Sequence, residues 1–445
     1  MINSPVAVVG GGIAGLTAAN NLRRQGVPVI LFEAGKQIAG MAASYTDDDG
    51  FSCDFGAHFI TNRLAAAIGI AAKCRDVKYY GETVHLEGRN HSYPFGLMKI
   101  PRFLSAAVEA RLSASTEPQS AAVWFRKTYG TALADDVALP LIEAWSGAPA
   151  TELSVAVANK LSHGVAYTAF LKVMSRWKGL AIANGYSHEM PENPDVWHVY
   201  PDGGVASLCK QLAEPLRDAI EMESPVEKIY VERGRAVAIR VRGQDRAVSA
   251  VISTAPCNIL PKLVEGTSVF QPLAYFRFRP MIFVNLKMEG RQLLPDTVLW
   301  TPEKGQPFFR LTETTQSMPW LAPEGKTLIT CDIGAELNDR FWRMTDSELG
   351  ALCIEHLAKF VPGASSRYLG CRVMKTPIAY PVFLNSYESQ RQAFEKSSGV
   401  DNLISIGRNG EFAHILMEDI YWRTLRKTST LAASLLSGHK LSAAA

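Results

Sequence analysis

The feature that most constrains the fold of this chain is a glycine-rich turn close to the N-terminus. An apolar segment over residues 6–9 leads into a G-x-G-x-x-G pattern at residues 10–15, and a helix-like stretch follows it. A second apolar segment over residues 29–32 ends on Glu33. A strand, a glycine turn, a helix and a second strand that ends on an acid together predict the βαβ unit of a dinucleotide-binding fold.

Each glycine of the turn has a separate structural role in such a unit. Gly10 makes the tight turn, Gly12 lets the backbone approach a pyrophosphate, and Gly15 lets the helix pack closely on the strand. The helix N-terminus faces the phosphate charge, and Glu33 would accept hydrogen bonds from the adenosine ribose. That acid disfavours NADP, whose 2′-phosphate it would repel, and leaves NAD and FAD open. The cofactor contacts expected in this unit are Gly10, Gly12, Ile13, Ala14, Gly15, Glu33 and Ala34.

Composition and charge exclude several other classes of protein. The 46 basic and 43 acidic residues give a net charge of only +3 without a dense Lys/Arg block, so we do not expect a nucleic-acid partner. The seven scattered cysteines include no CxxC pair, which argues against both a disulfide framework and a metal site. We find no signal peptide and no apolar run of membrane-spanning length, and therefore expect a cytoplasmic protein without an integral membrane segment.

Longer stretches of the chain resemble the flavin amine oxidase superfamily, which includes protoporphyrinogen oxidases, phytoene desaturases and UDP-galactopyranose mutases. The resemblance lies in residues 6–35 and 38–42, then in the Pro-Asp-Gly-Gly-Val segment 201–205, in Ser-Pro-Val at 224–226, and in Val-Ile-Ser-Thr-Ala-Pro at 251–256. Residues 55–62 and 407–412, with Glu418 and Asp419, look most like the protoporphyrinogen oxidase-like and mutase branches. The resemblance implies FAD as the cofactor.

The resemblance also implies an α/β fold of two interleaved domains. A Rossmann-type FAD-binding domain would comprise residues 1–60, 200–265 and 400–440. A substrate domain of antiparallel sheet with a helical insertion would comprise residues 61–199 and 266–399. The sequence itself indicates helices over residues 100–185 and further strands between residues 280 and 333.

The resemblance extends the set of expected site residues. The loop that carries His58 would lie beside the isoalloxazine ring, and a helix that starts near Glu418 would point backbone N–H groups at the flavin. We take His58 and His414 as candidate catalytic residues. The additional expected cofactor contacts are Gly40, Met41, Gly56, Ala57, His58, Val226, Gly407, Arg408, Glu418, Asp419 and Ile420. The resemblance leaves two roles open for five aromatic residues: they line a flat substrate pocket, or they belong to the core, which is the commoner role and keeps them off the catalytic list. They are Trp145, Phe308, Tyr380, Phe383 and Tyr387.

Three functional hypotheses remain open at this point. The first is an FAD-dependent oxidoreductase that transfers a hydride from an amine, or a similarly activated small organic substrate, to the flavin. The second is a redox-neutral isomerase that acts on a nucleotide sugar with reduced flavin, although the sequence does not reveal the arginine pair that would hold the diphosphate. The third is a flavin-binding protein without turnover. Lys287 is a candidate flavin-facing lysine by its rough position. The sequence does not predict an oligomeric state.

Overall fold

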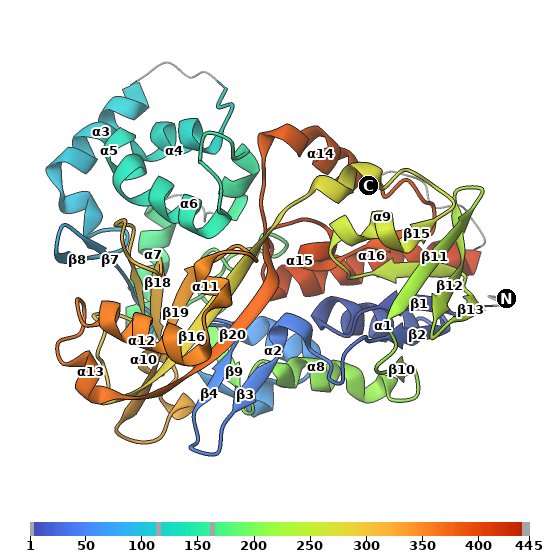
Figure 1. Ribbon diagram of the computed structural model, residues 1–445, viewed down its shortest axis with the longest axis horizontal. Helices are drawn as coiled ribbons and strands as arrows, with labels where there is room; N and C mark the ends of the chain where they lie inside the picture. Colours follow the sequence, from blue (N-terminus) through green and yellow to red (C-terminus); the bar gives the residue numbers. More distant parts are fainter. Residues whose placement is uncertain (1–3, 113–116, 161–164, 438–445) are drawn as a thin grey trace.

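The computed structural model describes residues 4–112, 117–160 and 165–437 (Figure 1). One lobe is built on a parallel sheet in the strand order β10-β2-β1-β14-β21. Its strands are β1 (Val6–Val9), β2 (Val29–Phe32), β10 (Ile220–Glu221), β14 (Ala250–Ser253) and β21 (Leu403–Ser405). Segments far apart in the sequence therefore lie side by side, and the short apolar strands fit a sheet that is covered on both faces.

Alternate residues of β1 point to opposite faces of this sheet, as strand geometry requires. Val6 and Val8 pack in one core cluster with α1 (Ile13–Arg24) and α16 (Met417–Ser437). Ala7 packs in a second cluster with an antiparallel layer of β11 (Val226–Glu232), β12 (Arg235–Val241) and β13 (Gln244–Ala247). The helix α1 begins at Ile13, whereas the helical pattern in the sequence suggested Leu16, because Gly12 and Ile13 already belong to its first turn.

The second lobe contains a seven-stranded sheet in the order β20-β16-β19-β18-β17-β7-β8. Its strands are β7 (Glu82–Leu86), β8 (Arg89–Ser92), β16 (Phe278–Glu289), β17 (Val298–Trp300), β18 (Arg310–Glu313), β19 (Lys326–Gly334) and β20 (Tyr368–Pro381). All neighbouring pairs are antiparallel except β17 with β7. The expected antiparallel sheet is therefore present, although the sequence did not indicate β7, β8 or β20.

Helices cover this second sheet from different parts of the chain. The helical insertion contains α3 (Pro101–Leu112), α4 (Ala121–Tyr129), α6 (Leu139–Ser146) and α7 (Val165–Lys178), seen on the left of Figure 1. Another helix, α12 (Asp346–Leu357), begins with the Thr345 and Glu348 capping box and packs on β16, β19 and β20.

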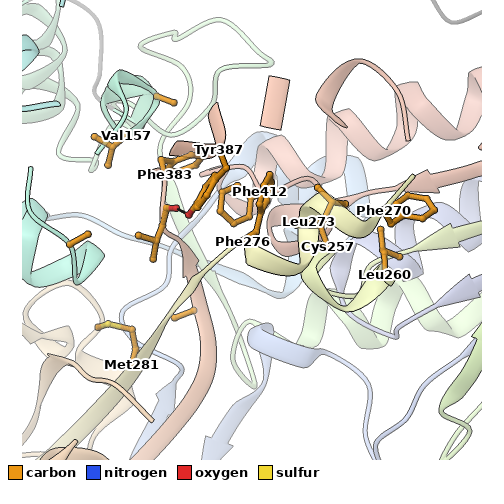
Figure 2. Packing of buried hydrophobic residues seen from close by; sticks show 14 of the residues in the cluster. Val157, Cys257, Leu260, Phe270, Leu273, Phe276, Met281, Phe383, Tyr387 and Phe412 are labelled. Atoms are coloured by element: carbon orange, nitrogen blue, oxygen red, sulfur yellow. Dashed lines mark hydrogen bonds between the residues drawn. The ribbon is translucent and has the colours of Figure 1, made fainter. Parts of the chain in front are cut away.

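An aromatic cluster connects the two lobes near the C-terminal segment (Figure 2). The ring of Phe276 lies 4.5 Å from that of Tyr387 and 4.7 Å from that of Phe412, and the Tyr387 hydroxyl donates to the backbone carbonyl of Val382. Burial of each such ring contributes roughly 1.5–3 kcal/mol. The cluster holds Phe412, which follows the 407–410 turn, against the chain that enters β16.

The strands of the parallel sheet fall within residues 6–32, 220–253 and 403–405. The exact boundaries of the two domains stay a prediction, and the expected ranges include residues 1–3, 113–116, 161–164 and 438–440, which lie outside the described residues. All seven cysteines are free thiols. No helix in the described part of the chain is both long and apolar enough to span a bilayer.

Candidate active site

The glycine turn between β1 and α1 has the geometry expected of a pyrophosphate site. Gly10 has a φ of +103° and donates its N–H to the carbonyl of Phe32 at 2.8 Å. A Cβ atom on Gly15 would overlap the Gly10 carbonyl oxygen, so only glycine allows this close packing of helix on strand. A Cβ atom on Gly12 would meet only the Ala39 oxygen, at 3.8 Å. The space in front of Gly12 is therefore free for a ligand.

A second turn, which contains Gly40, lies directly against the glycine turn between β1 and α1. The N–H of Ala39 donates to the Gly11 carbonyl at 2.9 Å, and a Cβ atom on Gly40 would lie 3.8 Å from the Gly12 Cα. Gly40 and Met41 form a short 3₁₀ turn that faces Gly12. Two glycine turns with little side-chain bulk thus border the same space, at the positively polarised end of α1.

The carboxylate of Glu33 lies beside the same turn. Its two oxygens accept the N–H groups of Gly11 and Gly35, each at 2.6 Å. The carbonyl of Glu33 accepts the N–H of Ser224 at 2.8 Å, two residues before Val226. The 224–226 segment therefore lies next to Glu33 and the exposed Ala34, where an adenosine would extend from the pyrophosphate.

The C-terminal motif reaches this turn through α15 (Gly407–Gly410). Gly407 has a φ of +81°, and a Cβ atom there would lie 3.0 Å from the Cβ of Ala14 in the first turn of α1. The next residue, Arg408, extends from this contact toward the second lobe. Two segments almost four hundred residues apart in sequence are therefore in contact at the helix N-terminus.

The loop that carries His58 follows β4 (Ser52–Asp54) and precedes β5 (Ile60–Thr61). Gly56 has a φ of +83°, and a Cβ atom there would lie 3.1 Å from the ring of Phe283. The buried Nδ1 atom of His58 has no hydrogen-bond partner among the described residues. Burial, together with the positive charges of Arg408 and Arg310, lowers the pKa of His58 to about 3. The imidazole is therefore neutral at physiological pH.

His414 and Arg408 meet at the aromatic ring of Tyr380. The rings of His414 and Tyr380 are nearly parallel with centroids 5.4 Å apart, and the Arg408 guanidinium lies 5.4 Å from the same Tyr380 ring. Trp145 lies 4.5 Å from His414. Burial lowers the pKa of Arg408, whose Nε donates to the carbonyl of Ile415 at 3.1 Å. Within the described chain, Arg408 forms no ion pair with a carboxylate.

A second arginine, Arg310 on β18, brings another guanidinium near His58. It forms an ion pair with the buried Asp332 on β19 and lies 5.5 Å from the Trp300 ring. Its charge acts on His58 and also on the hydroxyls of Tyr80 and Tyr186. Arg310 was not among the residues expected at the site, although one charged residue inside the apolar Phe-Phe-Arg-Leu run 308–311 was an available signal.

The two acids at the start of α16 are fully buried, and their side chains bind protein groups. Glu418 accepts Arg63 Nε at 2.6 Å and Thr61 Oγ1 at 2.9 Å. Asp419 accepts the Ser187 hydroxyl at 2.7 Å and the His188 N–H at 2.8 Å. These bonds place the α16 N-terminus against β5, next to the His58 loop. A contact from the backbone of residues 418–420, including the half-buried Ile420, to the flavin stays a prediction.

The ammonium of Lys287, the candidate flavin-facing lysine, is engaged by two acids. Its ammonium forms ion pairs with Asp47 and, at 3.0 Å, with Asp49 in the turn between β3 (Ser44–Thr46) and β4. The two acids raise the pKa of Lys287. Across the described ranges, no group of three His, Cys, Asp or Glu side chains could hold a metal ion.

The residues of this site fit FAD. The space in front of Gly12 and the α1 N-terminus would take the diphosphate, and Glu33 would face the ribose. The unpartnered Nδ1 of His58 and the unpaired charge of Arg408 lie further along the same path, where polar groups of the isoalloxazine would satisfy them. The fold and the site together define a two-lobed flavoprotein.

The chain belongs to the family of flavin containing amine oxidoreductases, whose family model matches residues 13–404. The cofactor is FAD, and the family is one of small-molecule oxidoreductases. Protoporphyrinogen oxidase 2 of Arabidopsis thaliana is 23% identical over 450 residues, which cover 88% of this chain and 86% of that protein. An FAD-dependent oxidoreductase of Colletotrichum higginsianum is 32% identical over 121 residues, 27% of this chain and 25% of that protein.

Solved structures share the whole fold. Reduced UDP-galactopyranose mutase superposes with a TM-score of 0.78 at 17% identity, with 98% of this chain and 96% of that chain covered. Cyclohexylamine oxidase from Brevibacterium oxydans gives a TM-score of 0.73 at 16% identity, with coverages of 97% and 99%. At these identities the likenesses establish the fold and do not identify the substrate.

Proposed function

We propose that this protein is an FAD-dependent oxidoreductase that removes a hydride from an amine, or from a similarly activated carbon of a small organic substrate. The observation that supports the proposal is that Arg408, one residue after the contact of Gly407 with the first turn of α1, lies over the Tyr380 ring that stacks on His414. The charges of Arg408 and Arg310 both act on His58. When bound, FAD supplies the hydride acceptor. The chain supplies orientation of the substrate and the electrostatic environment.

Arg408 favours the form of an amine that can be oxidised. A positive charge nearby disfavours a second one, so Arg408, which pairs with no carboxylate of the described chain, lowers the pKa of an ammonium group bound between the lobes. Asp332 balances the charge of Arg310. The bound amine is then neutral, and its nitrogen lone pair can stabilise the positive charge that hydride loss leaves on carbon. Arg408 also stabilises negative charge that develops in the site.

His58 acts in this proposal as a neutral hydrogen-bonding group. Its pKa of about 3 makes the imidazolium rare at neutral pH, so proton donation from a charged ring would be inefficient. Its unpartnered Nδ1 is available to a polar ligand group. The residue is therefore suited to orient a ligand, while His414, Tyr380 and Trp145 offer aromatic faces to the substrate.

An anaerobic reduction experiment tests the proposal. The purified holoprotein is mixed separately with amines, polyenes, porphyrinogens and nucleotide sugars, and the absorbance of oxidised flavin is followed. We expect an amine or another small reduced compound to bleach the flavin without added reductant. We also expect dithionite-reduced protein not to convert nucleotide sugars. Conversion of a nucleotide sugar only by the pre-reduced protein would overturn the proposal.

One observation favours the isomerase as a second candidate function. Arg310 and Arg408 extend from different lobes and both act on His58, so they could hold the two phosphates of a nucleotide sugar. Such an enzyme would need reduced flavin before each turnover and would leave it reduced afterwards. The same experiment therefore distinguishes the two candidates.

A further inference from the structure

Glu411 directly follows the 407–410 turn and bonds back to the first residue of that turn. Its N–H donates to the Gly407 carbonyl at 2.8 Å, and its carboxylate oxygen Oε1 accepts the Gly407 N–H at 3.1 Å. The side chain of Glu411 is only 8% exposed. Gly407 is also the residue that contacts Ala14 in the first turn of α1. Glu411 therefore binds both backbone polar groups of the residue that joins the C-terminal motif to the dinucleotide turn.

The second carboxylate oxygen of Glu411 is held by two cations of α16. Lys427 Nζ lies 2.9 Å from Oε2, and a guanidinium nitrogen of Arg423 lies 3.5 Å from the same atom. Arg423 also forms an ion pair with Glu189, which pairs with Arg426 at 2.6 Å. Burial of a carboxylate is costly unless it is paired and hydrogen-bonded, and Glu411 meets both conditions. The α16 cations therefore set the orientation of this carboxylate.

The other end of the turn is attached by different contacts. The Ser405 hydroxyl donates to the carbonyl of Gly410 at 2.8 Å, and Phe412 is fully buried in the aromatic cluster of Figure 2. Arg408 lies between the two ends, and its Nε donates to the carbonyl of Ile415 at 3.1 Å. The backbone from which the Arg408 side chain extends thus depends on both attachments, and Glu411 supplies the one nearer to α1.

We propose that Glu411 is a positioning residue that holds Arg408 at the isoalloxazine of FAD. The proposal rests on the part of the proposed function that brings Arg408 to the flavin, and it does not depend on the substrate. Reduction puts negative charge on the flavin ring, and a nearby guanidinium stabilises that charge, so Arg408 raises the reduction potential. Loss of Glu411 should therefore lower the potential. Removal of its negative charge alone would raise the potential, so the two explanations differ in sign.

The midpoint potential of FAD bound to the holoprotein tests the proposal without any substrate. Arg408→Gln should weaken the binding of reduced FAD relative to oxidised FAD on the order of tenfold, which is about 30 mV for a two-electron couple. Glu411→Ala should change this ratio in the same direction by a smaller factor. The double variant should have the potential of Arg408→Gln alone, because a positioning residue has no effect once the group that it positions is absent.

Two adjacent cations of α16 give a matched pair of milder variants. Lys427→Gln removes a cation that holds Glu411, whereas Arg426→Gln removes one that pairs with Glu189. Each variant loses one positive charge and one ion pair, so their melting temperatures and their direct charge effects on the flavin should be similar. Lys427→Gln should nevertheless lower the potential more than Arg426→Gln does.

Three results would overturn the proposal. The first is a potential that rises in Glu411→Ala, or shifts that add in the double variant, because Glu411 would then act independently of Arg408. The second is an equal potential in Lys427→Gln and Arg426→Gln. The third is an unchanged potential in Arg408→Gln, which would also remove Arg408 from the flavin. Amine oxidation plays no part in these measurements, so failure of amines to bleach the flavin would contradict the proposed function alone.

Discussion

The carbonyl oxygen of Gly10 occupies the position where a Cβ atom on Gly15 would lie, so the first turn of α1 rests directly on the end of β1. Gly12, between them, has ordinary extended backbone with φ at −81° and open space in front of it. The two glycines therefore have separable roles. Gly15 is needed to fold the turn, and Gly12 is needed to leave room for the ligand.

Valine substitutions at the two positions separate folding from cofactor binding. Gly15→Val should destabilise the protein by at least about 1–3 kcal/mol, the range for overpacked sites, because backbone cannot yield as a side chain can. Gly12→Val should fold, with the melting temperature of FAD-free protein unchanged, and should not retain FAD. Thermal melting and the ratio of flavin to protein absorbance measure both effects. Full flavin occupancy in Gly12→Val would show that the space is not the diphosphate site.

Glu33→Gln should weaken FAD binding by about 1.5–3 kcal/mol, the contribution of a hydrogen bond to a charged group. The change keeps the size of the side chain and one acceptor oxygen, and it removes the charge that the Gly11 and Gly35 amides bind and that the ribose hydroxyls would bind. Glu221→Gln is the matched control, because Glu221 ends the neighbouring strand β10 and pairs with Arg246. Titration of FAD-free protein with FAD gives both affinities, and equal affinities would remove Glu33 from the ribose.

The sequence predicts the parts of this site that depend on local backbone geometry. The glycine turn, the α1 N-terminus and Glu33 lie within one βαβ unit. The turn that contains Gly40 follows this unit directly in the sequence and contacts Gly11 and Gly12. The capping box of Thr345 and Glu348 and the closing helix α16 follow from equally local patterns. The antiparallel second sheet was expected from its apolar runs.

Long-range packing determines the rest. Arg310 enters the site only because β18 pairs with β19, where Asp332 holds its guanidinium, and Tyr380 reaches His414 only because β20 extends along β16 to Pro381. The residue spacing of the sequence carries no trace of these pairings. Lys287 was a candidate flavin-facing lysine because of its position in the chain, but its ammonium forms ion pairs with Asp47 and Asp49. Trp145 is a buried core residue and Tyr380 packs against the same cluster, and both rings also border His414.

Asp54 should make stability depend on pH in an unusual direction. It is fully buried, and burial raises its pKa to about 7 despite hydrogen bonds from the Ser44 hydroxyl at 2.5 Å and the Tyr200 hydroxyl at 2.9 Å. A carboxyl with a raised pKa in the folded state stabilises the fold below its unfolded pKa of about 4, and this stability is lost as pH rises through about 7. Its contribution is on the order of a few kcal/mol.

Asp54→Asn keeps the shape of the side chain and cannot ionise. The difference in free energy of unfolding between this variant and the unchanged protein should therefore change between about pH 4 and about pH 7, with the variant gaining relative stability as pH rises. Denaturant unfolding at several pH values measures it. Asp48→Asn is the control, because Asp48 is exposed at the protein surface. A pH-independent difference between Asp54→Asn and the unchanged protein would show that Asp54 is ionised throughout.

The last prediction concerns Arg408 and the protonation of a bound amine. In the proposed function, Arg408 lowers the pKa of the substrate ammonium, so the rate of anaerobic flavin reduction should rise with pH through a midpoint below the pKa of the free amine. Arg408→Gln removes this charge and should move that midpoint upward by about one pH unit, because one unit corresponds to about 1.4 kcal/mol of repulsion. Stopped-flow reduction at saturating amine measures the profile in variants that retain FAD. Arg75→Gln, which removes an exposed arginine paired with Asp202, should leave the midpoint in place.

His58→Gln should slow reduction without adding an inflection near neutral pH, because burial already keeps the His58 imidazole uncharged there. An unchanged midpoint in Arg408→Gln would mean that its guanidinium does not face the substrate nitrogen.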